Sequence, residues 1–149
     1  MRGMRIFKSL LVLLIGLTAI AYVAQNLSSA GVMRAQMMAT DQTAANASAS
    51  WAAFALITLC QLALAGAALR GAWELFVARG GSPEEFRHAK TTAVWAGGLS
   101  LLLWFLLSLT VAAGLFQWGT DSGEAALAKA FALGTTSALT ILFVWGTTD

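Results

Sequence analysis

The sequence is poor in charged residues and rich in apolar ones. Of its 149 residues, 11% are charged and 58% are hydrophobic, whereas soluble globular domains average ~25% charged and ~45–50% apolar residues. A soluble domain of this length has no core large enough for so many apolar side chains. Intrinsic disorder is excluded as well, because disordered chains are polar and charge-rich. The composition therefore predicts a small integral membrane protein.

The residues that usually build catalytic or metal sites are also scarce. The chain has one cysteine, Cys60, and one histidine, His88. A disulfide framework needs paired cysteines, and a metal cluster or a haem pair needs more ligands than these two. No Ser/His/Asp set, phosphate loop or Cys–His spacing appears, and the net charge of +2 is too small to argue for nucleic-acid binding. We therefore expect no enzyme activity, no cofactor and no metal.

Four apolar stretches have the length of a transmembrane helix, which needs about 20 mostly apolar residues. The expected spans are residues 6–24, 51–73, 91–116 and 125–146. They leave an exterior loop at 25–50 and a cytoplasmic loop at 74–90. The sequence thus predicts an all-α polytopic membrane protein, a four-transmembrane-helix bundle that forms a single domain over residues 1–149.

The basic residues are distributed unequally between the two sides of this bundle. Seven of the nine fall on one side: Arg2, Arg5, Lys8, Arg70, Arg79, Arg87 and Lys90. The other side has only Arg34 and Lys129. Loops rich in Lys and Arg stay in the cytoplasm, so both termini are expected there, in a bacterial inner membrane. The basic start and Ala19-Ile20-Ala21 also resemble a secretory signal peptide, but we expect the first span to be retained.

The two longer connections carry local signals. In the exterior loop, the pattern at 29–39 favours a short interfacial helix over a linker, whereas 44–50 is typical of an Ala/Ser linker. In the cytoplasmic loop, Gly80-Gly81 is expected to end the second helix. The motif Ser82-Pro83-Glu84-Glu85 then supplies an N-cap Ser, a Pro at the first helical position and the Glu of a capping box. A third helix is predicted from Pro83 to about Phe116.

Each span carries a stripe of small or hydroxyl residues at helical spacing, the pattern of helix contacts in lipid. The stripes are Ser9, Gly16, Ala19 and Asn26; Thr58, Gln61, Ala65, Ala68 and Ala72; Ala93, Gly97, Ser100, Trp104 and Ser108; and Ala126, Ala130, Gly134 and Ser137. They predict a tight bundle with no wide pore. The candidate site residues in its interior are Thr58, Gln61, Ser100 and Trp104. A hydrogen bond between helices is the favoured role of Gln61, and contact with a lipid or quinone near Trp104 is the alternative.

No ionisable residue is expected near the middle of a span. Lys8, Lys129, Arg70 and Glu74 lie close enough to an interface for their side chains to reach the headgroups. A proton-coupled transporter normally needs an acid or a His at depth. His88 precedes the third span and is interpreted as a solvated loop residue.

Short motifs along the chain resemble an uncharacterised family of bacterial four-span proteins, described as predicted small integral membrane proteins. The motifs are Lys8-Ser9-Leu10-Leu11, Met38-Ala39-Thr40-Asp41, Gly71-Ala72-Trp73, Phe86 with Ala89-Lys90, Leu103-Trp104-Phe105 and Thr110-Val111. The resemblance implies the four-span topology, and the family has no assigned activity. It also implies that a Glu often stands where this chain has Gln61, so this member lacks the candidate intramembrane acid.

These observations lead us to expect a non-catalytic accessory protein. It would dock on a larger inner-membrane complex, such as a bioenergetic one, and support its assembly or stability. Its partners would be membrane lipids and other integral membrane subunits, without nucleic acid. One alternative is a small transporter or channel that acts as a homo-oligomer. The other is a lipid- or quinone-binding membrane protein that uses Gln61 and Trp104.

Overall fold

The computed structural model describes residues 2–39, 44–112 and 121–147, and these are helical except at Gly81, Ser82 and Thr147. The elements are α1 (Arg2–Ala39), α2 (Ala44–Val77), the short 3₁₀ helix η1 (Ala78–Gly80), α3 (Pro83–Ala112) and α4 (Asp121–Gly146). Each of the four long helices contains a stretch that is long and apolar enough to cross a membrane. The prediction of an all-α protein with four spans is confirmed.

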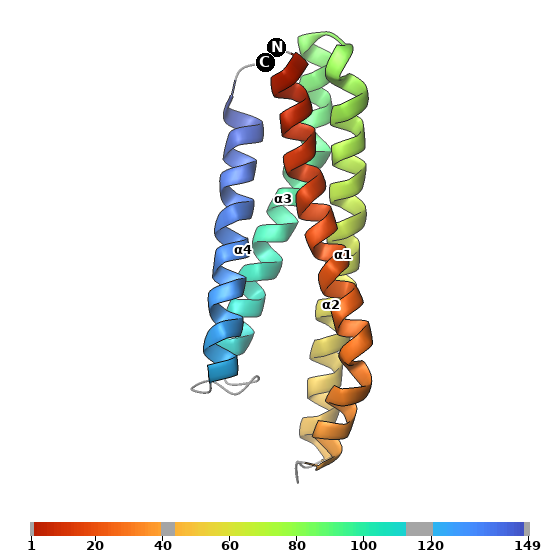
Figure 1. Ribbon diagram of the computed structural model, residues 1–149, viewed down its shortest axis with the longest axis vertical. Helices are drawn as coiled ribbons and strands as arrows, with labels where there is room; N and C mark the ends of the chain where they lie inside the picture. The colour runs from red at the N-terminus through yellow and green to blue at the C-terminus, as the bar shows by residue number, and fades with distance from the viewer. Residues whose placement is uncertain (1, 40–43, 113–120, 148–149) are drawn as a thin grey trace.

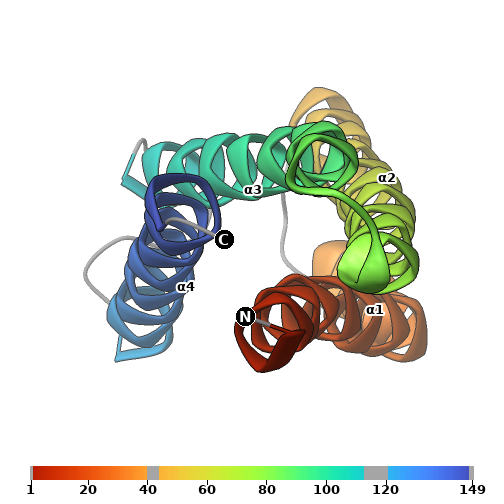
Figure 2. The same ribbon diagram turned by 90° about the horizontal axis from the view of Figure 1, so that it is seen from above.

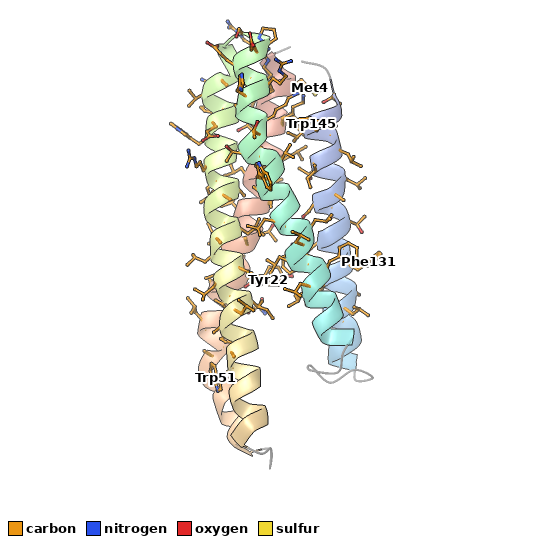
Figure 3. The ribbon with its side chains drawn as sticks, turned by 180° about the vertical axis from the view of Figure 1, so that it is seen from behind. Met4, Tyr22, Trp51, Phe131 and Trp145 are labelled. Carbon is orange, nitrogen blue, oxygen red and sulfur yellow. The ribbon has the colours of Figure 1, made fainter. Side chains whose placement is uncertain are left out.

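The helices form two hairpins that are joined at one end of the molecule (Figure 1). α1 packs along α2, α3 packs along α4, and α2 contacts α3, whereas α1 barely touches α4. Viewed from above, the helices follow one another round an open ring with α1 and α4 at its free edges (Figure 2). α1 begins and α4 ends at the same end, close to Met4 and Trp145 (Figure 3). We call this the terminal end.

The turn between α2 and α3 follows from its local sequence. The Ser82 hydroxyl accepts a hydrogen bond from the backbone N–H of Glu85 at 3.2 Å, and the Glu85 carboxylate accepts one from the N–H of Ser82 at 2.8 Å. Pro83 is the first residue of α3, a position where its missing N–H costs no hydrogen bond. The predicted capping box is therefore present. The expected end of this helix near Phe116 lies outside the described residues.

The structure differs from the expected exterior loop at 25–50. α1 continues without a break to Ala39, and α2 begins at Ala44. The range 29–39 is thus the end of a long helix and not a separate interfacial helix, and 44–50 forms the first turns of the next helix and not a linker. Alanine has the highest helix propensity and this segment has no proline, so the backbone stays helical beyond the apolar span.

The stripes of small residues form the contacts between the helices. Every stripe residue whose side chain the structure describes is buried or half-buried; the side chains of Ser108 and Ala126 fall outside this description. A methyl group added at Gly16 would lie 3.3 Å from the Cβ of Ala68 in α2. The hydrophobic effect does not drive helices together in lipid. The helices associate instead through the van der Waals contacts that small residues allow when two backbones approach closely.

Large apolar side chains cover the outer faces of the helices. Leu14, Leu59, Leu102 and Leu142 are each more than half exposed, and Phe131 points away from the bundle on α4 (Figure 3). A soluble monomer rarely exposes this much contiguous apolar surface. The burial pattern therefore agrees with a bundle whose outer surface meets lipid chains.

We predict that Gly71→Ala destabilises the bundle by about 1–3 kcal/mol, the usual cost of overpacking. The new methyl group would lie 2.9 Å from the backbone of Ala93 in α3, so α2 and α3 would have to separate. Gly66→Ala is the matched control, because nothing lies within 4 Å of its added Cβ in the same helix. Unfolding in mixed detergent–SDS micelles measures both variants. Equal stabilities would contradict the close contact of α2 with α3.

Candidate functional site

A polar network links α1 to α2 inside the membrane-spanning part. The side-chain amide of Asn26 donates to the Oε1 atom of Gln61 at 2.8 Å and to the hydroxyl of Thr58 at 3.2 Å. The Thr58 hydroxyl donates in turn to the carbonyl of Phe54. Because Gln61 is only 2% exposed, its amide oxygen needs this partner on the neighbouring helix.

The other two sequence candidates, Ser100 and Trp104, lie on α3 and make different contacts. The hydroxyls of Ser100 and Ser137 are 2.8 Å apart and buried, which links α3 to α4. Trp104 is 3% exposed, and its ring meets the ring of Tyr22 in α1 edge to face, with the centroids 5.1 Å apart. The four candidates are thus divided between three helix contacts and do not converge on one point.

A groove lies between α1 and the α3–α4 pair, and we call it the α1–α4 groove. Its volume is about 100 Å³, which is room for several water-sized groups, since one such group takes roughly 10–15 Å³ in this measure. Its walls include Leu11, Leu14 and Thr18 of α1, Trp104 of α3, and Thr136 and Thr140 of α4. Leu14 and Thr136 are exposed, so the groove opens sideways toward the surrounding membrane.

Four of the five hydroxyl groups that line the α1–α4 groove take part in hydrogen bonds within the protein, and Thr140 is the fifth. Thr18 donates to the carbonyl of Leu14, and Thr136 to that of Ala132, each at 2.8 Å and one turn back along the same helix. This is the usual arrangement of Thr in apolar surroundings. The hydroxyls of Ser100 and Ser137 share one hydrogen bond, in which one donates and the other accepts. The groove therefore presents a largely apolar lining to an occupant.

Three cations meet around Phe86 near the terminal end, and we call Arg5, Lys8 and Lys90 the cation cluster. Arg5 and Lys90 are each 6% exposed, and Lys8 and Phe86 are fully buried. The Phe86 ring centroid lies 4.7 Å from the guanidinium carbon of Arg5, and 5.7 and 5.6 Å from the Nζ atoms of Lys8 and Lys90. Cation–π attraction strengthens when the cation is desolvated, so the ring offsets part of the cost of burying these charges.

Backbone carbonyls from two further segments complete the cation cluster. Arg5 donates from an Nη atom to the carbonyl of Gly81 at 2.8 Å. Lys8 and Lys90 both donate to the carbonyl of Thr147, at 2.9 and 3.4 Å. The cluster thus joins α1, α3, the α2–α3 turn and the end of α4. The Nε atom of Arg5 is buried and has no hydrogen-bond acceptor among the described residues.

The burial of Lys8 is a correction to the sequence analysis, which placed its side chain at the headgroups. Arg5, Lys8 and Val12 lie three to four residues apart and all face inward, because helical spacing puts them on one face of α1. The same spacing relates Phe86 to Lys90 on α3. These two spacings are the features of the sequence that could have revealed the cluster. The count of Lys and Arg that predicts the orientation does not consider the helix face on which each charge lies.

The remaining polar groups at this end do not form a metal centre. Among the described residues, no three His, Cys, Asp or Glu side chains lie close enough to hold a metal ion. Glu74, Glu85 and His88 border an open hollow beside the α2–α3 turn. Glu74 is paired with Arg70 at 2.8 Å, and Glu85 caps α3.

Comparison with protein families gives a match over most of the chain. The model of a family described as "Predicted small integral membrane protein (DUF2165)" matches residues 4–146. The chain belongs to this family. The resemblance inferred from its short motifs is confirmed, and the match spans all four helices. No curated protein and no solved structure matches this DUF2165 member.

We predict that Asn26 and Gln61 are energetically coupled across the α1–α2 contact. Asn26→Leu, Gln61→Leu and the double variant should give a coupling energy of about 0.6–1.7 kcal/mol, the range for hydrogen bonds between membrane helices. Gln25→Leu, at the neighbouring exposed position, should show no coupling to Gln61→Leu. Unfolding in mixed micelles supplies the four stabilities of each cycle. Equal coupling in both cycles would exclude a specific bond.

Proposed function

We propose that this DUF2165 member is a non-catalytic lipid-binding membrane protein that holds an acyl chain in the α1–α4 groove. The observation that carries the proposal is the groove itself, which opens sideways between α1 and α4 and has a volume of about 100 Å³. A chain lying in the membrane can enter from the side without crossing the bundle. A bundle that is close-packed throughout, with no ligand site, would have no such opening.

The lining favours an acyl chain over a quinone ring. Quinone carbonyls need hydrogen-bond donors, but the hydroxyls of Thr18 and Thr136 donate within their own helices. The flexible walls from Leu11 and Leu14 can adapt to a chain, and the ring of Trp104, packed against Tyr22, gives it a rigid side. An apolar chain therefore gains dispersion contacts and leaves the hydrogen bonds of Thr18 and Thr136 intact.

We predict that Thr136→Trp blocks the acyl chain, whereas Thr135→Trp does not. Both threonines are exposed on α4 and donate to the carbonyl four residues back, but Thr136 lines the groove and Thr135 does not. Protein in nanodiscs with diazirine-labelled diacyl lipid would be irradiated, and the labelled peptides mapped by mass spectrometry. Labelling of α1 and α4 groove residues should fall about tenfold in Thr136→Trp, a loss of ~1.4 kcal/mol.

The adjacent variant makes this test specific. Thr135→Trp adds the same ring one position along the helix, so it controls for expression, insertion and bulk. Similar labelling of the two variants, or labelling spread evenly over all outer faces of the wild-type protein, would overturn the proposal of a lipid groove.

An accessory role in a larger complex is a second candidate, and it is favoured by the shape of the α1–α2 hairpin. The sequence places the end of the first apolar span near residue 24 and the start of the second near residue 51, whereas α1 continues to Ala39 and α2 begins at Ala44. The helical turns beyond these spans extend roughly 10–22 Å at 1.5 Å per residue, and the hairpin projects past α3 and α4 (Figure 1). A helical projection outside the membrane would give a partner subunit a surface to bind.

We predict that shortening this projection releases any partner subunits. Deleting 33–39 together with 44–50 removes two helical turns from each helix and leaves the four spans complete. Tagged full-length protein, extracted in mild detergent, should carry a stoichiometric set of membrane subunits that the shortened protein lacks. A full-length protein that migrates alone on native gels would contradict the accessory role and leave lipid binding unaffected.

A further inference from the structure

We propose that the hydroxyl of Thr140 donates a hydrogen bond to the ester carbonyl of the acyl chain that lies in the α1–α4 groove. This inference rests on the proposed function, because the groove supplies the contacts to the chain. It adds the chemical group that the site recognises, the carbonyl oxygen of an ester-linked lipid, and the direction in which the chain lies.

Thr140 differs from the other threonines of the groove, because its hydroxyl has no hydrogen-bond partner among the described residues. Thr18 and Thr136 each donate to a carbonyl one turn back along their own helix. Thr140 is only 8% exposed, and its oxygen is not fully enclosed, in contrast to Nε of Arg5, so it can be reached from the groove that it lines. A hydroxyl this far from water needs an acceptor, and an occupant of the groove can supply one.

The buried serine pair beside Thr140 supplies a second donor. The hydroxyls of Ser100 and Ser137 carry two hydrogens, of which one forms the bond between them at 2.8 Å. The other hydrogen has no acceptor among the described residues. Ser137 and Thr140 are three residues apart on α4, a spacing that places them on one helix face, and both line the groove. A carbonyl oxygen has two lone pairs, so one ester carbonyl can accept both bonds.

The position of Thr140 determines the direction of the chain. Thr140 lies about 10 Å along α4 from Thr147 at the terminal end, and Leu133 lies about 10 Å farther into the membrane. The charged side chains at the terminal end mark it as the side of the headgroups. An ester carbonyl joins the acyl chain to the headgroup, so it belongs at the end of the groove where Thr140 lies. The chain then runs from Thr140 toward Leu133 and Trp104.

The arrangement of the donors favours an ester over a quinone, a second class of membrane carbonyl compound. A quinone carries two carbonyls on opposite sides of its ring, so it needs donors on both sides of the groove. On α1 the lining consists of Leu11, Leu14, Ile15 and Thr18, and the Thr18 hydroxyl already donates to the carbonyl of Leu14. The hydroxyl donors that remain lie on the side of α3 and α4, which suits a single carbonyl.

The experiment compares two phosphatidylcholines with the same diazirine-labelled chains, one linked through esters and the other through ethers, which lack the carbonyl. Each is a trace component of nanodiscs made from unlabelled ether lipid, so that the bulk lipid does not compete for the hydroxyl. Wild-type protein should label in the groove about fivefold more strongly with the ester lipid. This ratio corresponds to the ~1 kcal/mol of one neutral hydrogen bond.

Thr140→Val should remove the preference for the ester lipid, because valine is close to threonine in shape and lacks the hydroxyl. Thr135→Val is the matched control on α4, since Thr135 is exposed and lies outside the groove, and it should keep the preference. A preference that persists in Thr140→Val would overturn the proposal.

The outcomes separate this inference from the proposed function. Equal labelling of the wild-type groove by the two lipids overturns the carbonyl contact and leaves the groove standing. No groove labelling by either lipid removes both. The wild-type comparison needs no variant, so it decides the matter even where Thr140→Val does not fold.

A further arm distinguishes the source of the carbonyl. Loss of the ester preference in excess decylubiquinone would assign the hydroxyl to a quinone carbonyl and overturn the assignment to an ester. A preference that decylubiquinone leaves unchanged supports the proposal.

Discussion

The close contact of α2 with α3 at Gly71 determines the shape of this bundle. Only a residue without a Cβ lets the two helices approach so closely beside Ala93, and this contact lies near the terminal end, where the two hairpins are joined. Farther along, α3 and α4 stay together but diverge from α1 (Figure 1). The divergence produces the α1–α4 groove, so one backbone contact determines both where the bundle closes and where it opens.

The membrane environment explains how the polar groups are distributed over the four-helix bundle. Lipid offers no hydrogen bonds, so each polar side chain inside must find a partner in the protein. Asn26 and Gln61 do so across two helices, and Thr136 does so within its own helix. The cations instead gather at the terminal end, where Phe86 and backbone carbonyls surround them. The lining of the groove is therefore largely apolar, and among the described residues the buried side-chain atom without a hydrogen-bond partner is Nε of Arg5.

The sequence predicts those features that depend on local periodicity. The spans, the capping box at Ser82 and the inward stripes containing Gly16 and Ser137 all follow from spacing along one helix, and the structure contains them. The groove and the cation cluster depend instead on which helices pair and how each is rotated, information that no single segment carries. Lys8 shows the difference, because its place in the sequence indicated a position near the headgroups, whereas the rotation of α1 turns it inward beside Phe86. The helical turns at 44–50 were missed for another reason: Ala and Ser are common both in linkers and in helices.

The cation cluster holds the terminal end of the bundle together. Arg5 holds the α2–α3 turn through Gly81, while Lys8 and Lys90 hold the end of α4 through Thr147. The Phe86 ring lies against all three cations and offsets part of the cost of burying them. The terminal end is therefore held together by contacts that run between α1, α3, the α2–α3 turn and the end of α4, whereas α1 and α4 themselves make few direct contacts.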